Sequence, residues 1–187
     1  MDAWMGHLPE GVRRTRSLCE LALPCGHNAG ARAVKRIPSS TLAGYVGQIA
    51  TLPGMAQCIE AIAMPIASGA AVCQSLSVLE LLRAGVRVLD FRVGMHDGEV
   101  HICHTVICDL MLVEALQQVS EFLQAGSMEI VAVLIKRDWD HPDFDSEENW
   151  AIVQATVLSM FGDMMVTGEH ELALPLHDLL ARCRGVA

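Results

Sequence analysis

Two histidines, an aspartate and an arginine are the candidate catalytic residues of this sequence. Asp90 and Arg92 lie two positions apart in one apolar stretch, and His104 ends the next one. His27 follows an earlier apolar run, in a turn of small residues. An unperturbed imidazole titrates near neutral pH, so two of them can serve as a general base and a general acid. A guanidinium between them could neutralise charge on a phosphate group.

Two short strands joined by a turn are expected to position three of these groups. Alternation along residues 86–93 puts Asp90 and Arg92 on one face and the apolar Leu89 and Phe91 on the other. The segment Met95-His96-Asp97-Gly98 turns the chain into a second strand. There Val100, Ile102 and His104 share a face. We therefore expect the site where these two strands end.

The rest of the chain alternates between strand-like and helix-like stretches. Strands are predicted over residues 18–23, 86–93, 99–104 and 129–135. Helices are predicted to begin after Ser77, Asp109 and Ser146, with a last helical turn at 176–180. This order favours an α/β architecture with parallel strands and right-handed crossovers. Lys136 and Arg137 follow the fourth strand, so the interesting polar groups all fall at strand ends, where parallel barrels build active sites.

Composition limits the classes of function. The chain has 187 residues, 52% of them hydrophobic, which suits one domain with its own core. A net charge of -9 with only 13 Lys and Arg argues against nucleic-acid binding. The seven cysteines form no CxxC pair and are odd in number, which predicts core residues in a reducing compartment rather than disulfides or a zinc site. The first residues lack the pattern of a secretory signal, so a cytosolic start is expected.

The most apolar stretch runs from about Val46 to Cys73. It contains Pro53, Pro65 and Glu60, a poor composition for a membrane-spanning helix. Burial in the core and contact with a membrane surface both remain open for this segment.

Several segments together resemble the X region of phosphatidylinositol-specific phospholipases C. The resemblance rests on these pieces in order: Gly26-His27-Asn28-Ala29-Gly30, Cys73-Gln74-Ser75-Leu76-Ser77, Leu81-Leu82, Gly85-Val86-Arg87 and Leu89-Asp90-Phe91-Arg92. The turn with Asn28 and Ala29-Gly30 looks most like the trypanosomatid glycosylphosphatidylinositol phospholipase C. The likeness runs from about Cys19 to the C-terminus and is weakest from about Ala31 to Ser68.

The resemblance implies a distorted TIM-type barrel and a phospholipase C reaction on phosphatidylinositol or its glycosylated form. His27 would be the general base, His104 the general acid, and Arg92 the phosphate ligand, with Asp90 orienting the site. Products would be an inositol cyclic phosphate and diacylglycerol. Asn28 and Lys136 would contact substrate, and Arg137 is the near alternative to Lys136. Each of these roles is carried over from the family.

The resemblance also bears on metals. Metal-dependent members of the wider family bind calcium through acidic residues near the position of Arg92. A fixed guanidinium and a hard cation cannot share one point, so we expect neither a metal nor another cofactor.

Length sets a limit on the transfer from the family. The family barrel continues for several more strands, which supply the carboxylate that partners the first histidine. We predict an N-terminal extension over residues 1–17 and the N-terminal portion of the barrel over 18–187, truncated after about four strands. The open edge could favour self-association.

We expect a cytoplasmic protein, peripheral to membranes, without a transmembrane span.

Other interpretations compete with this one. A catalytically impaired relative that binds lipid or a partner would keep the same residues. A phosphodiesterase acting on glycerophosphodiesters would need clustered acidic metal ligands near His27, which are missing. Asp90 and Arg92 could form only a buried ion pair, and the acidic residues of 138–148 are typical of a solvated loop and helix start. The remaining histidines, His7, His96, His101, His141, His170 and His177, are expected to be solvated or capping.

Overall fold

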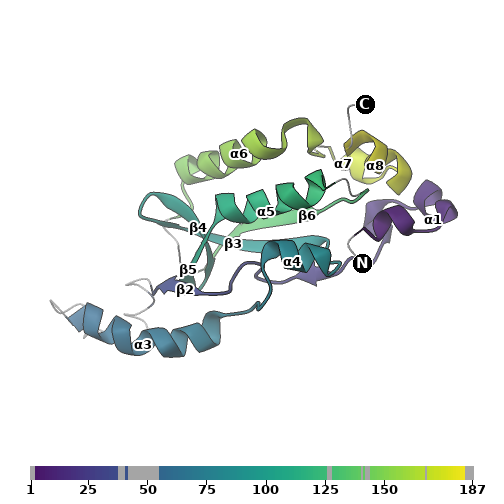
Figure 1. The fold of residues 1–187 in the computed structure, drawn as a ribbon. Helices are drawn as coiled ribbons and strands as arrows, with labels where there is room; N and C mark the ends of the chain where they lie inside the picture. Colours follow the sequence, from purple (N-terminus) through teal and green to yellow (C-terminus); the bar gives the residue numbers. More distant parts are fainter. Residues whose placement is uncertain are drawn as a thin grey trace.

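A mixed sheet covered by helices on one face forms the body of the protein (Figure 1). This computed structural model describes residues 3–37, 41, 55–125, 128–139, 141, 144–166 and 168–183. The strands are β1 Cys25–Gly26, β2 Val34–Arg36, β3 Val88–His96, β4 Glu99–His104, β5 Val106–Met111 and β6 Ala132–Arg137. The α-helices are α1 Glu10–Thr15, α3 Met55–Ala71, α4 Val78–Arg83, α5 Leu112–Gln124, α6 Glu147–Phe161, α7 Glu169–Leu172 and α8 Leu176–Cys183. Short 3-10 helices are η1 Met5–His7, η2 Leu18–Glu20 and η5 Gly162–Met164.

Strand β3 is the centre of the sheet and has neighbours on both edges. On one edge β6 runs parallel to it along 88–93. On the other edge β1 pairs in parallel with Val88 and Leu89, while β4 pairs antiparallel from Val93 to His96. Residues 90–92 therefore lie between the end of β1 and the end of β4. Strands β5 and β2 extend the sheet antiparallel beyond β4, so the expected parallel pairing holds for β1, β3 and β6, and the other described pairs are antiparallel.

Two further predictions about elements were wrong. Residues 18–23 do not form a strand, because Leu18–Glu20 is the 3-10 helix η2 and the strand that pairs with β3 begins only at Cys25. Asp109 does not cap a helix, since it lies inside β5, where its N–H donates to the Ala33 carbonyl over 3.1 Å. The helix that follows, α5, starts at Leu112.

Local signals at helix ends and at the hairpin were confirmed. The Ser77 hydroxyl accepts from the Glu80 N–H, and the Glu80 carboxylate accepts from the Ser77 N–H, which begins α4. Ser146 caps α6 in the same sense by accepting from the Asn149 N–H. The turn between β3 and β4 has positive φ at Asp97 and Gly98, as two-residue hairpins require.

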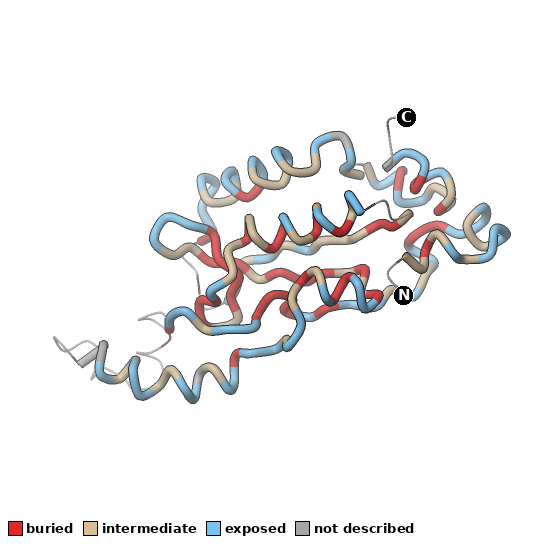
Figure 2. Tube along the Cα trace, viewed as in Figure 1, coloured by how far each residue is buried: buried red, intermediate tan, exposed pale blue. Residues whose placement is uncertain are grey.

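The main core lies between the sheet and helices α4, α5 and α6 (Figure 2). Phe91 is fully buried there, together with its strand neighbours Leu89 and Val93. Burying a side chain of this size contributes about 1.5–3 kcal/mol. Alternation along β3 therefore turns Asp90 and Arg92 to the opposite face, away from the helices, as predicted.

The N-terminal segment packs on a second, smaller core. Met5 and Leu18 are buried there against Ile130 and three leucines of α8. Next to Met5 lies a fully buried ion pair, in which Arg87 Nε donates to Glu129 Oε2 over 2.5 Å. Glu129 Oε1 also accepts from the Met5 N–H over 2.7 Å. The pair thus joins the start of β3 to the N-terminal segment.

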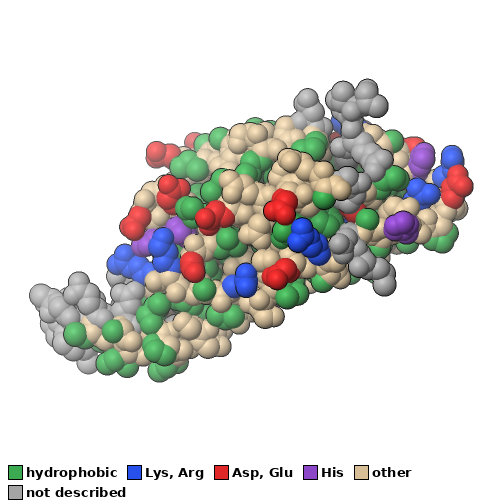
Figure 3. Space-filling model, viewed as in Figure 1, with side chains coloured by type: hydrophobic (Ala, Val, Ile, Leu, Met, Phe, Trp, Pro, Cys, Tyr) green, Lys and Arg blue, Asp and Glu red, His purple; other side chains and the backbone are tan. Residues whose placement is uncertain are grey.

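Helix α3 lies along the outside of the body, next to β2 (Figure 1). Figure 3 shows hydrophobic side chains over its outer surface. It covers residues 55–71 of the apolar stretch 46–73, and residues 46–54 lie outside the described residues. No helix in the described ranges is long and apolar enough to cross a bilayer. The described strands form a partial sheet that does not close into a barrel, and β6 pairs with β3 alone.

Candidate active site

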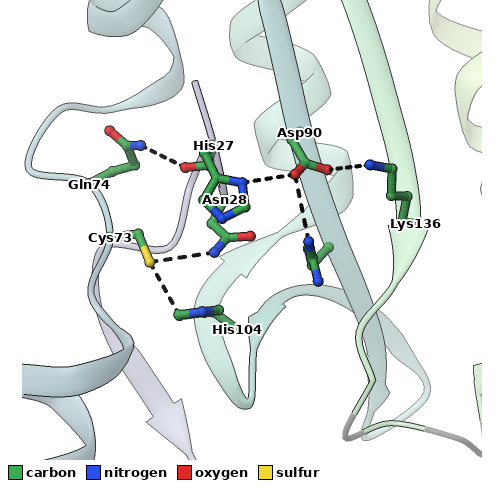
Figure 4. A network of polar contacts seen from close by, with 8 residues as sticks. His27, Asn28, Cys73, Gln74, Asp90, His104 and Lys136 are labelled. Carbon is green, nitrogen blue, oxygen red and sulfur yellow. Dashed lines mark hydrogen bonds and ion pairs between the residues drawn. The ribbon is translucent and has the colours of Figure 1, made fainter. Parts of the chain in front are cut away.

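The two histidines of the site come from two strands that share one edge of β3. Gly26 of β1 pairs with Leu89, so His27 leaves the strand level with Asp90. Strand β4 approaches from the opposite direction, with Ile102 opposite Val93, so His104 comes level with Phe91. The histidines therefore flank the polar face of β3. Figure 4 shows the network of polar contacts at this face: His27 contacts Asp90, and His104 contacts Cys73, which also accepts from Asn28, the residue after His27.

Asp90 is the centre of this network. One carboxylate oxygen, Oδ2, lies 3.1 Å from His27 Nδ1 and 3.9 Å from Arg92 Nη2. The other, Oδ1, lies 3.5 Å from Lys136 Nζ. The Asp90 side chain is 8% exposed, whereas that of His27 is 67% exposed. A carboxylate in this position can fix the imidazole by accepting its Nδ1–H, and the nearby Arg92 and Lys136 carry charges opposite to its own.

His104 is held by the end of α3. Its Nδ1 lies 3.0 Å from the carbonyl oxygen of Ala71, which can only accept, so Nδ1 carries a hydrogen. The thiol sulfur of Cys73 lies 3.2 Å from the same nitrogen. This arrangement leaves Nε2 as the ring nitrogen that can exchange a proton with a ligand.

Asn28, the residue after His27, has a strained backbone conformation. Its φ of 47° is in the left-handed region, which asparagine tolerates better than most residues. The side chain is buried, and its Nδ2 donates to Cys73 Sγ over 3.5 Å. Within the site, the buried atoms Asn28 Oδ1, Asp90 Oδ1 and Arg92 Nε make no hydrogen bond, although Asp90 Oδ1 lies 3.5 Å from Lys136 Nζ. Such unsatisfied groups are uncommon inside proteins and occur at sites of function.

Lys136 joins the site and Arg137 does not. Both lie in β6 rather than after it, because this strand ends two residues later than predicted. Lys136 pairs in register with Arg92 and so points to the same face. Arg137 points the other way, and its Nε lies 3.6 Å from Asp145 Oδ2. Of the seven residues predicted for the site, Arg137 is the one that the structure places elsewhere.

Three groups of the network were missed by the sequence analysis: the Ala71 carbonyl, the Cys73 thiol and the Gln74 amide. Gln74 Nε2 donates to the carbonyl oxygen of His27 over 2.7 Å. Most cysteines were predicted to be core residues, but among the described ones only Cys103 and Cys108 are buried, whereas Cys73 is exposed, as are Cys19, Cys25 and Cys58. Nothing in the local pattern indicates these contacts, because Ala71–Gln74 reaches the histidines only through tertiary folding.

Other titratable groups lie apart from this network. His101 is 1% exposed, against the expectation that it is solvated, and its Nδ1 lies 3.0 Å from the Cys108 carbonyl. Burial lowers the pKa of His101, and the nearby Lys35 adds to this. Burial raises the pKa of the Cys108 thiol to about 12. Within the described ranges, no three His, Cys, Asp or Glu side chains are grouped to hold a metal ion.

The arrangement provides the groups that acid–base chemistry on an anionic ester requires. His27 Nε2 can accept a proton, because its Nδ1–H is directed to Asp90. His104 Nε2 can give one up, and Arg92, which lies beside Asp90, supplies a fixed positive charge.

Comparison with known proteins identifies the family. The family model described as PI-PLC X 1 matches residues 66–161, about half of the chain. The human PI-PLC X domain-containing protein 1 is 32% identical over 108 residues, which cover 56% of this chain and 32% of that protein. The matched range includes Asp90, Arg92, His104 and Lys136, whereas His27 precedes it.

Solved structures show the same fold. The phosphatidylinositol-specific phospholipase C of Listeria monocytogenes superposes with a TM-score of 0.63 and 18% identity, over 95% of this chain and 53% of that one. A Staphylococcus aureus phosphatidylinositol-specific phospholipase C, from work on its membrane binding, superposes with a TM-score of 0.57 and 20% identity. The match covers 89% of this chain and 46% of that one. The chain thus spans about a third of the human relative and about half of the bacterial enzymes, with the fold of part of a TIM-type barrel. It belongs to the PI-PLC X family of phosphatidylinositol phospholipase C-like proteins.

Proposed function

We propose that this chain cleaves the phosphodiester of phosphatidylinositol, or of a glycosylated form, by attack of the inositol 2-hydroxyl on phosphorus. The observation that carries the proposal is the placement of His27 and His104 at the two strand ends that flank Asp90 and Arg92. Family membership and the fold support the same reaction class.

His27 acts as the general base. Its Nδ1–H is donated to Asp90, so Nε2 takes the proton of the 2-hydroxyl as the oxygen bonds to phosphorus. The buried carboxylate stabilises the imidazolium that forms. Asp90 is thereby a positioning residue. It supplies from β3 the carboxylate contact that the family resemblance assigns to later strands.

His104 acts as the general acid. Protonated on both nitrogens, it keeps Nδ1–H on the Ala71 carbonyl and delivers the Nε2 proton to the glycerol oxygen as the P–O bond breaks. The products are diacylglycerol and an inositol cyclic phosphate. No step needs an oxidant, a metal or a water molecule.

Arg92 neutralises the charge that develops on the phosphate. Its side chain is 22% exposed and its Nη2 lies 3.9 Å from Asp90 Oδ2, so its exposed part can meet a phosphate oxygen at this face. Lys136 lies half exposed on the same face, where it could donate to an inositol hydroxyl. Asn28 Oδ1 offers an acceptor near the attacking group.

The test is turnover by the purified chain. Phosphatidylinositol labelled in the inositol ring is presented in detergent micelles with a chelator, and the release of labelled cyclic phosphate is followed. The variant His27→Ala/His104→Ala serves as the matched blank. Release above this blank supports the proposal. Lipid binding without release selects the catalytically impaired relative, and activity that appears only on adding a divalent metal contradicts the assigned chemistry.

A further inference from the structure

The hairpin that carries His104 turns on a single residue. His104, the last residue of β4, pairs with Val106, the first residue of β5, so Thr105 alone forms the turn between the two strands. The φ of Thr105 is 64°, in the left-handed region, where a β-branched residue is an outlier. Such a conformation costs free energy and persists only where neighbouring groups hold it. The place of His104 at the end of the hairpin therefore depends on the groups that hold Thr105.

Two buried side chains hold Thr105 from two other parts of the chain. The N–H of Thr105 donates to Asp138 Oδ1 over 3.3 Å, and its carbonyl oxygen accepts from Thr41 Oγ1 over 3.2 Å. Asp138 is 3% exposed and Thr41 is 8% exposed. The turn residue is thus held through both of its backbone polar groups, by side chains that are themselves fixed by burial.

Asp138 is in turn attached to the centre of the sheet. It directly follows β6, and its N–H donates to the carbonyl oxygen of Val93 in β3 over 3.0 Å. Lys136, two residues earlier, lies 3.5 Å from Asp90 Oδ1. One strand end therefore both faces Asp90 and holds the hairpin of His104. The prediction that Asp138 lies in a solvated loop was wrong, and burial of its carboxylate is offset by the hydrogen bond that it accepts.

We propose that Asp138 is a positioning residue of the reaction, which holds the end of the hairpin so that His104 presents Nε2 to the leaving oxygen. This inference rests on the proposed function. The ring of His104 is held by the Ala71 carbonyl oxygen, 3.0 Å from Nδ1, and its backbone is held by the adjacent turn. Without the Asp138 acceptor, Thr105 relaxes toward negative φ, and His104 moves away from Ala71.

The contact is made to a backbone N–H, and this decides which substitutions matter. Asp138→Asn keeps a side-chain oxygen that can accept the N–H, whereas Asp138→Ala removes the acceptor. Thr41→Val removes the second contact to Thr105 and leaves Asp138 in place. The matched control is Glu114→Ala, because Glu114 Oε2 accepts the Met111 N–H over 3.0 Å at the other end of β5.

Two substrates separate a role at His104 from a general loss of structure. Phosphatidylinositol releases a glycerol oxygen that needs a proton, whereas a nitrophenyl ester of inositol phosphate releases a stable phenolate that needs none. Asp138→Ala should lower kcat on phosphatidylinositol by at least about tenfold, because a general acid out of place transfers its proton slowly. It should change kcat on the nitrophenyl ester by less than about twofold, as should His104→Ala, whereas His27→Ala should lose activity on both substrates. Thr41→Val should show the same pattern as Asp138→Ala with a smaller loss, while Asp138→Asn and Glu114→Ala should match the parent.

Nuclear magnetic resonance of isotope-labelled histidine rings gives a second readout, which does not depend on turnover. In the parent chain the neutral ring of His104 should carry its hydrogen on Nδ1, directed to the Ala71 carbonyl. Asp138→Ala should convert this signal to a mixture of the Nδ1–H and Nε2–H forms, and Glu114→Ala should leave it unchanged. If Asp138→Ala does not fold, Thr41→Val decides the question by the same two readouts.

Three results would overturn the positioning role. They are an unchanged His104 signal in Asp138→Ala, an equal loss of activity on both substrates, and an Asp138→Asn variant as impaired as Asp138→Ala. A parent chain that turns over neither substrate would instead refute the proposed reaction. The His104 signal would then still show whether Asp138 positions the ring.

Discussion

The carboxylate of Asp90 lies 3.1 Å from Nδ1 of His27, although the two residues are 63 positions apart in the chain. The contact arises because Gly26, the last residue of β1, pairs with Leu89, so that the next residue, His27, lies level with Asp90 of β3. An acid within this half of the barrel thus orients the first histidine. The proposed acid–base pair is therefore assembled from described residues of this chain.

Replacing either histidine by alanine tests the acid–base assignment. His27→Ala and His104→Ala should each lower kcat by about 10²–10⁴, the usual contribution of one proton-transfer group. The kcat of the double variant should be little lower than that of either single variant, because the two groups act in one step. His7→Ala, at an exposed site in η1, should be unchanged. The measurement is release of inositol cyclic phosphate, and full activity in either single variant would refute the assignment.

Asp90→Asn tests the orienting contact. The amide keeps the size of the side chain but loses the charge that holds His27, Arg92 and Lys136, so kcat/KM should fall on the order of a hundredfold or more. Asp90→Glu should restore part of the activity. Asp109→Asn, exposed in β5, is the control. A purely structural role would instead appear as a loss of thermal stability at constant kcat.

Lys136 and Arg137 can be told apart by kinetics. Lys136→Ala removes a cation from the face of Asp90 and should raise KM by about three- to tenfold, the loss of one hydrogen bond made by a half-exposed group. Arg137→Ala breaks only the pair with Asp145, which is largely exposed, and should leave kcat and KM nearly unchanged. The opposite ranking would mean that the register of β6 differs from the one described.

Arg87→Met tests the buried ion pair. It leaves Glu129 ionisable and buried without its partner, which should cost about 3–5 kcal/mol of unfolding free energy. Arg83→Met, which removes a surface contact of 3.5 Å with Glu121, should cost less than about 1 kcal/mol. Urea unfolding followed by circular dichroism gives both values. If both substitutions lower the free energy of unfolding equally, the buried ion pair contributes no more to stability than the surface one.

The buried His101 predicts a loss of stability in mild acid. Burial holds its pKa below the usual value, so the unfolded chain binds the proton more readily than the folded one. Stability should therefore fall as pH drops below about 6.5, the ordinary histidine pKa, and level off below the depressed pKa. His101→Gln keeps a donor for the Cys108 carbonyl and should show a flatter Tm against pH between 7 and 5. The same slope in both proteins would assign the acid sensitivity to other groups.

The alternation around Phe91 and the caps at Ser77 and Ser146 could be predicted because each depends on residues only a few positions apart. The strand containing Asp109 could not, since its polar and apolar residues fit a helix start equally well until β4 and β2 supply hydrogen-bond partners. Leu18–Glu20 shows the reverse: an apolar run that reads as a strand but packs as a 3-10 helix against α8.

Residue type and local spacing were enough to predict the family, the polar face of β3, and His27, Asp90, Arg92 and His104 as candidate site residues. The folded structure was needed to show that Asp90 contacts His27, that Ala71 contacts His104, and that Lys136 rather than Arg137 lies beside Asp90. The reason is physical: a strand pattern fixes which side chains share a face, but strand register and the path of α3 fix which faces meet.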